Sequence, residues 1–203
     1  MKISIQRTAP EDFGTTENIT REAFWNVYKP GCDEHFVLHN LRICKSYIGE
    51  LDLIALTENM IVGHILTTKA KIIDAQNNEH EILCVGPLSV LPEFQQKGIG
   101  SMLLNESIRL AGELGYPGMI LFGNPDYYHR FGFKNAEQYS IKTKEDQNFE
   151  PFMALELQIN GLADKGGRFF EDSAFVADPI ELSEFEKQFP YKEKLVTDMQ
   201  FKH

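Results

Sequence analysis

The chain of 203 residues is 42% hydrophobic and 25% charged, which is the composition of a soluble globular protein with a sizeable core. Its formal net charge of -10 argues against nucleic-acid binding, because an acidic surface repels phosphates and no basic run offsets it. No apolar run is long enough to cross a bilayer, and the opening MKISIQRTAP lacks the apolar stretch of a secretory signal. Three cysteines without paired spacing suit a reducing compartment, so we expect a cytoplasmic protein.

The first 46 residues predict one strand and two helices. Polar and apolar residues alternate over 2–7, as in a strand. The TAPE segment has the pattern of a capping box, with Thr8 as N-cap and Glu11 three residues later. It predicts a helix that runs to about Tyr28. After KPGCDEH breaks this helix, a second one is expected over 33–46.

The next segment predicts a hairpin followed by an irregular strand. Residues 51–74 form two strands joined around Glu58-Asn59, and AQNNEHE is the turn that follows. Gly86-Pro87 then interrupts the strand EILCVGPLSVLP. Because proline cannot donate a hydrogen bond to a neighbouring strand, we expect a bulge there or, alternatively, a sheet edge.

A helix, a short strand and a helical turn come next. The helix after Gly98 places four apolar residues on one stripe, Leu104, Ile108, Ala111 and Leu114. GMILFG is a wholly apolar strand, as buried strands are. NPDYYHRFGF predicts one or two helical turns that end at Gly132, and strands are expected near 137–143 and 151–158.

The tail from about residue 161 contains GGRFF, a predicted strand at SAFVAD and a helix candidate at PIELSEFEKQF. The whole succession of strands and helices predicts a mixed α/β sheet in one domain.

The segment QQKGIG at 95–100 stands directly before a helix. The first turn of a helix leaves N–H groups unpaired, glycines permit close approach, and a phosphate is the usual ligand. A P-loop is excluded, because Lys97 precedes both glycines instead of following them. A dinucleotide fingerprint is incomplete, because Leu103 stands in the place of its third glycine. A tight turn without a ligand is the remaining alternative.

Three motifs, in this order, carry a resemblance to a known family: GPLSVLP at 86–92, QQKGIG with the form [Q/R]-x-x-G-x-[G/A], and YYHRFGF at 127–133. On these motifs the chain resembles the GNAT superfamily of acyl-CoA-dependent N-acetyltransferases, and within it a small bacterial branch. The resemblance covers about residues 2–158, with its specificity in 86–133.

The resemblance implies a single mixed, mostly antiparallel sheet flanked by helices, with splayed central strands, over residues 1–160. Residues 161–203 are then a C-terminal extension, a strand plus a helix. We expect it to pack on the same domain, or on a partner subunit in a homodimer.

The implied activity is transfer of an acetyl group from acetyl-CoA to a primary amine, by direct attack in a ternary complex. The acceptor is a small molecule or a peptide, and the sequence does not identify it, because such sites are built from variable loops. The acidic surface would attract a cationic amine, although it serves solubility equally well. A catalytically weak acetyl-CoA-binding sensor or interaction module is the alternative. No nucleic-acid or membrane partner is expected.

The resemblance also implies roles for individual residues. Lys97 adds a charge and Ser101 a hydroxyl to the amides that hold the pyrophosphate, and Asn124 both caps a short helix and touches the cofactor. Tyr128, four residues before Gly132, protonates the thiolate; a packed aromatic is its alternative role. Backbone groups of Leu88 and Val90 hold the pantetheine arm, and Ser89 points the other way. The implied cofactor-binding set is Leu88, Ser89, Val90, Gln95, Gln96, Lys97, Gly98, Ile99, Gly100, Ser101, Asn124 and Tyr128.

The general base is the least specified part of the site. Some family members use a glutamate on the strand before the loop, and Cys84 holds the matching position here. Glu81, at one end of that strand, is a weak candidate base, and a water chain to solvent is an equal alternative. Cys84 itself is expected to be a core residue, because it lies in an apolar run without a histidine at triad-like spacing.

The segment CDEHFVLHNLRIC contains Cys32, His35, His39 and Cys44, and its two histidines share a helix face. Their spacings match no common zinc finger, so we expect no metal. The resemblance instead assigns this segment to the cap of the acceptor site. His129 and Arg130 are expected to face solvent or the cofactor's phosphates.

Overall fold

The computed structural model describes residues 2–197 and Gln200. Within them, nine strands form one sheet in the order β1-β2-β3-β4-β5-β8-β6, with β9 beside β3 and β7 beside β9. The strands are β1 (Ser4–Arg7), β2 (Asp52–Thr57), β3 (Met60–Ile73), β4 (Glu79–Val90), β5 (Gly118–Phe122), β6 (Lys134–Asn135), β7 (Ile141–Lys142), β8 (Phe152–Glu156) and β9 (Gly167–Phe170). The helices are α1 (Phe13–Phe24), α2 (Glu34–Ile43), α3 (Ile99–Glu113), α4 (Pro125–Tyr128) and α5 (Pro179–Glu186).

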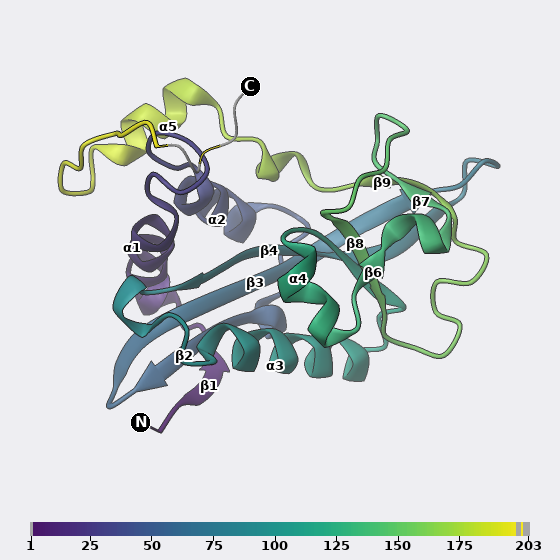
Figure 1. The fold of residues 1–203 in the computed structure, drawn as a ribbon, viewed down its shortest axis with the longest axis horizontal. Coiled ribbons are helices and arrows are strands. Elements are labelled where there is room, and N and C mark those ends of the chain that lie inside the picture. The colour runs from purple at the N-terminus through teal and green to yellow at the C-terminus, as the bar shows by residue number, and fades with distance from the viewer. Residues whose placement is uncertain (1, 198–199, 201–203) are drawn as a thin grey trace.

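Helices cover both faces of the sheet (Figure 1). Along β4, Leu83 and Val85 point to the face that α3 covers, whereas Ile82 and Cys84 point to the opposite face. On that opposite face, α1 and α2 lie over the sheet, and α5 of the tail lies against them (Figure 1). All neighbouring strands are antiparallel except the pairs β4–β5 and β7–β9. The expected fold class is confirmed.

The hairpin between β2 and β3 turns at Glu58 and Asn59, as predicted. Both residues have positive φ, 49° and 67°. Two such residues form the tight turn whose twist matches that of the strands it connects. The turn sets the pairs Thr57–Met60 and Leu56–Ile61, and the register then shifts by one residue between Leu56 and Ala55.

The central strands part at the predicted irregularity of β4. On β3, Ile65 faces Leu88 and Thr67 faces Val85, so two residues of β4, 86 and 87, oppose one residue of β3. On its other side β4 pairs with β5 only through Leu83 and Cys84. The rest of β4, up to Val90, therefore has an open edge toward β5.

The predicted capping box at Thr8 is wrong. The Thr8 amide donates to the Asp52 carbonyl at 2.9 Å, so this residue continues the β1–β2 ladder and cannot cap a helix. Its hydroxyl oxygen is buried without a hydrogen-bond partner among the described residues. A 3-10 turn, Pro10–Asp12, precedes α1, which ends at Phe24 and not near Tyr28.

Two other expected elements and one expected core residue differ from the structure. SAFVAD is not a strand: the Asp172 carboxylate accepts the Ala174 amide and caps a 3-10 helix, Ser173–Phe175. The expected strand near 137–143 consists of a 3-10 helix, Ala136–Tyr139, followed by the two-residue β7. α3 ends at Glu113, and Leu114, expected on the apolar stripe of this helix, is 47% exposed.

A buried charged cluster fixes α2 on the sheet. Arg42 of α2 donates through Nε to Asp52 of β2 at 2.9 Å, and His64 of β3 lies 2.8 Å from the same carboxylate. Burial alone would raise the pKa of Asp52, but the hydrogen bonds from His64 and Arg42 and the charge of Arg42 together hold it below its usual value. Burial lowers the pKa of His64, so the neutral ring donates to Asp52 from Nε2.

Replacing Asp52 should destabilise the fold strongly. In Asp52→Asn the Arg42 charge stays buried without its counter-ion, which costs about 3–5 kcal/mol of the free energy of unfolding at pH 7. Asp146→Asn removes an exposed pair with Lys142 and should cost less than about 0.5 kcal/mol. Urea unfolding measures both, and equal midpoints would contradict the role of this cluster.

The difference in the free energy of unfolding between wild type and Asp52→Asn should depend on pH. A carboxylate whose folded pKa is depressed adds stability above its unfolded pKa, near 3.9, and loses it as the pH falls through the folded value. The gap between wild type and Asp52→Asn should therefore narrow below about pH 4.

Candidate active site

A cavity of about 1240 Å³ opens where β4 and β5 part. Its walls come from the open edge of β4, the start of α3, the β5–α4 turn, the α1–α2 connection and the segment after β9. One cavity thus joins segments that lie far apart in the sequence.

The loop before α3 presents unpaired amides to this cavity. The Gln95 amide donates to the Pro92 carbonyl, and the Met102 amide to the Gly98 carbonyl. Between them, the amides of residues 96–101 have no acceptor among the described residues. Positive φ values at Gln96 (59°) and Gly98 (81°) shape this loop. The amides therefore form an anion-binding concavity at the positive end of a 15-residue helix.

Of the two cations considered for this site, Arg130 lines the cavity and Lys97 does not. Lys97 donates to the Glu93 carbonyl at 2.6 Å, its Nζ lies 4.9 Å from the centroid of the Phe94 ring, and it does not line the cavity. The Arg130 guanidinium does line the cavity, 4.7 Å from the centroid of the Tyr127 ring. The sequence did not decide whether Arg130 faces solvent or a phosphate, because helical spacing alone does not set the direction of so long a side chain.

The peptide groups of Leu88 and Val90 face the open edge of β4. The Leu91 amide donates to β3 at Val62, and the Val90 carbonyl accepts from the Gln95 side chain at 3.0 Å. Alternation along a strand then directs the peptide groups of 88 and 90 away from β3. Ser89 is buried, and its Oγ lies 3.0 Å from Thr20 Oγ1 of α1.

Tyr128 lines the middle of the cavity. Its ring packs over Gly123, where a Cβ atom would collide with it. Burial raises the pKa of Tyr128 well above its usual value, and the neighbouring Tyr127 and Tyr28 raise it further. The phenol therefore stays protonated and available as a donor. Asn124, also on the cavity wall, caps α4 by accepting the Asp126 amide at 3.0 Å, as predicted.

Glu81, the carboxylate that the sequence suggested as a base, is not among those that line the cavity. Glu81 is exposed on the sheet surface, 3.2 Å from Lys69 Nζ, and does not line the cavity. Asp33, Glu34 and Glu171 do line it. Burial raises the pKa of both glutamates, Glu34 and Glu171. Sequence reasoning missed Glu171, because nothing in GGRFFED shows that the tail returns to this cavity.

The histidines and cysteines of the α1–α2 region have protein partners. His35 Nε2 lies 2.8 Å from Glu186 of α5, and its Nδ1 lies 3.4 Å from Cys32 Sγ. His39 Nδ1 lies 3.0 Å from Glu17 of α1. Within the part of the chain that the structure describes, no group of three metal-ligating side chains is arranged to hold an ion.

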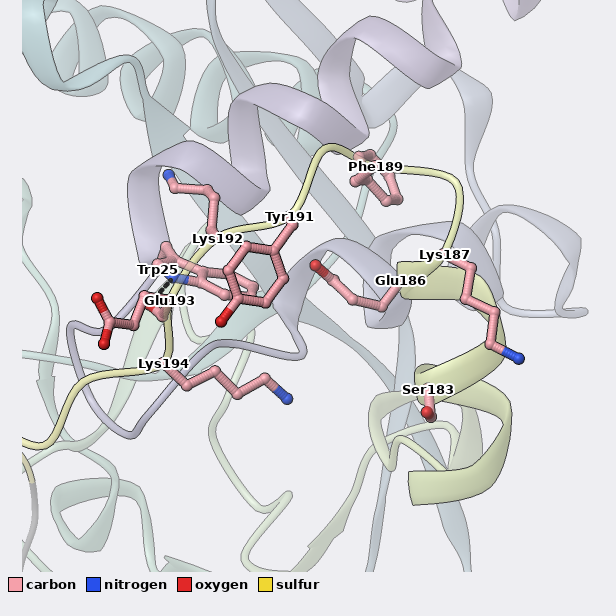
Figure 2. Close-up of a pocket in the computed structure, with 9 residues that line it drawn as sticks. All are labelled: Trp25, Ser183, Glu186, Lys187, Phe189, Tyr191, Lys192, Glu193 and Lys194. Carbon is pink, nitrogen blue, oxygen red and sulfur yellow. Dashed lines mark hydrogen bonds between the residues drawn. The ribbon is translucent and has the colours of Figure 1, made fainter.

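A second cavity, of about 610 Å³, lies between the end of α1 and the tail (Figure 2). The Trp25 indole lines it and donates to the Glu193 carbonyl at 2.9 Å, shown as a dashed line in Figure 2. It shares no lining residue with the cavity at the β4–β5 opening. Within the described residues, no helix is both long and apolar enough to span a membrane.

Residues 50–135, which include the loop before α3 and α4, match the family described as "Acetyltransferase (GNAT) domain". A crystal structure of a GNAT family acetyltransferase from Brucella melitensis, in complex with acetyl-CoA, is 26% identical, with a TM-score of 0.71. That similarity covers 86% of this chain and 99% of the Brucella chain. The chain belongs to the GNAT superfamily.

Two further relatives bear on this GNAT protein. It is 24% identical over 107 residues, 53% of its length, to the uncharacterized N-acetyltransferase YhbS of Escherichia coli K12, and this match spans 59% of YhbS. The structure of YhbS in complex with CoA shares the fold, with a TM-score of 0.76 at 20% identity, over 86% of this chain and 92% of that one. The uncharacterized N-acetyltransferase YjhQ of the same organism is 33% identical over 84 residues, 41% of this chain and 46% of YjhQ.

The Cys84 thiol should be inert in the folded GNAT protein. Its side chain is buried, and burial raises its pKa well above the usual value, so the reactive thiolate is scarce. At pH 8, iodoacetamide should alkylate Cys84 at least about a hundredfold more slowly in the native protein than in 8 M urea. Peptide mass spectrometry measures both rates. Rapid alkylation of native Cys84 would restore it as a candidate nucleophile.

Proposed function

We propose that this GNAT protein is an N-acetyltransferase that transfers the acetyl group of acetyl-CoA directly to a primary amine in a ternary complex. The observation that carries the proposal is one continuous cavity that joins the unpaired amides before α3, the open edge of β4 and the protonated Tyr128. The three cysteines of the chain are all free thiols, which supports a location in the reducing cytoplasm.

The diphosphate of acetyl-CoA fits the amides of residues 96–101. These amides are unpaired, the helix end is positive, and Arg130 adds a full charge to the same cavity. Gly100 keeps the approach open: a Cβ there would lie 2.9 Å from the Tyr127 hydroxyl, which already borders the space. The Brucella relative was crystallised with acetyl-CoA and YhbS with CoA, which supports the same class of ligand.

The pantetheine arm carries two amides, and the peptide groups of Leu88 and the Val90 amide, which lie free on the open edge of β4, suit it as an added strand would. Bound in this way, the arm directs the thioester toward Cys84, where β4 and β5 separate, and toward Tyr128. The amine nitrogen attacks the carbonyl carbon, and a backbone N–H on the edge of β4 stabilises the charge that develops on oxygen. As the C–S bond breaks, Tyr128 donates its proton to the sulfur.

The acceptor end of the cavity favours a cationic amine. Asp33 and Glu34 line it from the start of α2, and Tyr28 and Phe24 of the α1 end lie in the same wall. Carboxylates beside aromatic surfaces attract ammonium groups through charge and through the ring faces.

Gly100→Ala should weaken acetyl-CoA binding. The added methyl group enters the space between the helix end and the Tyr127 hydroxyl, so the dissociation constant should rise about tenfold or more. Gly112→Ala, near the other end of α3, meets no atom within 4 Å and should leave affinity unchanged. Calorimetric titration with acetyl-CoA measures both, and equal affinities would contradict a phosphate site here.

Tyr128→Phe should lower kcat about a hundredfold with little change in the KM for acetyl-CoA, because the proton donor is lost but the ring remains. Tyr139→Phe, in the 3-10 helix Ala136–Tyr139, is the control. Because the pKa of Tyr128 is raised, wild-type activity should not decline through loss of this proton below about pH 10. CoA release from acetyl-CoA, followed with a thiol reagent over a panel of amines, measures these effects.

The sensor alternative has a different signature. Tight acetyl-CoA binding without turnover on any amine, together with no effect of Tyr128→Phe, would support a binding module and overturn the transferase.

A further inference from the structure

Direct transfer to an amine requires a proton acceptor, since an ammonium group of pKa about 10.4 is almost wholly charged at neutral pH and cannot attack. Cys84 carries no basic group at the point where β4 and β5 part, and Glu81 of the same strand is outside the cavity. The described residues must therefore supply a base from another element, or the proton must leave through water.

We propose that Glu171, in the tail, is the general base of the acetyl transfer. It lines the same cavity as Cys84 and Tyr128, although it follows β9 and lies more than forty residues after Tyr128 in sequence. The inference rests on the proposed acetyltransferase function and adds a catalytic residue to it.

The backbone on either side of Glu171 is held in place. Phe170, the residue before it, pairs with Lys71 of β3. Asp172, the residue after it, accepts the Ser46 hydroxyl at 2.5 Å and the Ala174 amide at 2.9 Å. Fixed neighbours on both sides hold the backbone of Glu171 in place at the wall of the cavity, which favours the preorganisation that catalysis requires.

Alternation along the chain directs Glu171 toward the β4–β5 opening. Phe169, two residues earlier, points into the cluster that contains Cys84, and its ring lies 6.3 Å from that of Phe122 on the cavity wall. Residues two apart in an extended segment point the same way. Glu171 also lies close enough to Cys84 for its negative charge to raise the pKa of the thiol.

Glu171 is the cavity carboxylate that has no competing partner. Asp33 is paired with Lys29, and the Glu34 carboxylate accepts the Asp33 amide at 3.1 Å. Glu171 makes no hydrogen bond or ion pair with any described residue within the usual distances. Its two lone-pair-bearing oxygens are therefore free to accept a proton from a substrate or from a water molecule.

The surroundings tune this carboxylate upward. Burial raises the pKa of Glu171, Glu145 raises it further, and Lys144 opposes them. A base with a pKa nearer to neutrality accepts a proton more readily. The other titratable or charged groups on the walls of the cavity are Cys84 of β4, Tyr127, Tyr128 and Arg130 near α4, and Tyr28, Asp33 and Glu34 of the α1–α2 region.

The reaction then balances. The Glu171 carboxylate takes one proton from the ammonium, directly or through one water, and the neutral nitrogen forms the C–N bond to the acetyl carbon. The nitrogen's second proton is released to solvent, the C–S bond breaks with its electron pair on sulfur, and Tyr128 protonates that sulfur. Tyr128 regains a proton from solvent and Glu171 releases one, so the products are the N-acetyl amine, CoA and one proton.

The test is the pH profile of Glu171→Gln, with spermidine, tyramine and L-lysinamide as acceptors. At pH 7, kcat/KM for the amine should fall about a hundredfold, while the dissociation constant for acetyl-CoA stays unchanged. The deficit should shrink as the pH approaches about 10, because the amine then loses its proton in solution. Glu137→Gln, an exposed carboxylate that does not line the cavity, is the matched control and should behave as wild type.

Two results would overturn the assignment of Glu171. One is a kcat/KM equal to that of wild type at every pH. The other is a deficit that stays constant from pH 7 to pH 10, which shows a structural role and not a proton acceptor.

A second measurement, hydrolysis of acetyl-CoA in the absence of an amine, does not depend on the choice of acceptor. Water then takes the place of the amine, so slower hydrolysis in Glu171→Gln supports the base, and unchanged hydrolysis overturns it. A wild-type protein that neither acetylates these amines nor hydrolyses bound acetyl-CoA would overturn the acetyltransferase itself, and the base with it. Failure of Glu171 alone leaves wild-type turnover intact, so the two failures are distinguishable.

Discussion

The separation of β4 from β5 after Cys84 is the constraint on which the site depends. Gly86 and Pro87 place two residues opposite one residue of β3, and β5 makes no further pairs with β4 beyond Cys84 and Ile120. A flat, fully paired sheet would satisfy these peptide groups internally and leave no cavity. The bulge instead exposes them along one edge, and the unpaired amides of α3 lie at the end of the same opening. A local disruption of the ladder thus creates both the room and the hydrogen-bonding groups that a linear, amide-containing ligand requires.

The opposite wall depends on buried charge. Arg42 joins α2 to β2 and also donates to the Thr16 hydroxyl of α1, so one guanidinium fixes both helices relative to the sheet. Thr20 of α1 then meets Ser89 on the far side of the open edge of β4. Because these contacts are short, buried and directional, the α1–α2 connection that carries Asp33 and Glu34 has a defined place over the cavity.

The sequence predicts the parts of the fold that depend on local chemistry. Gly86-Pro87, the glycines before α3, and the caps at Asn124 and Gly132 act through their own backbone, so their consequences are local and were foreseen. Thr8 was misjudged because a distant strand recruits its amide. The direction of the Lys97 side chain was not foreseen, because so long a side chain can reach a nearby carbonyl, here that of Glu93. Glu171 was missed because its proximity to Cys84 requires β9 to return to β3, and no local pattern encodes a contact over almost ninety residues.

The tail is therefore part of the folded site and not an addition to it. Arg21 is 1% exposed, and Glu186 of α5 accepts from its Nε at 2.8 Å while also holding His35. Without α5, Arg21 of α1 and His35 of α2 would lose the Glu186 carboxylate that they share. Loss of the partner of a buried charge destabilises a fold strongly. The same tail carries β9 into the sheet and Glu171 to the cavity. The motifs that resemble the family lie within 86–133, yet the wall of the cavity is completed by Glu171 and Phe175, which follow β9. A shared fold alone does not fix the substrate of such a cavity.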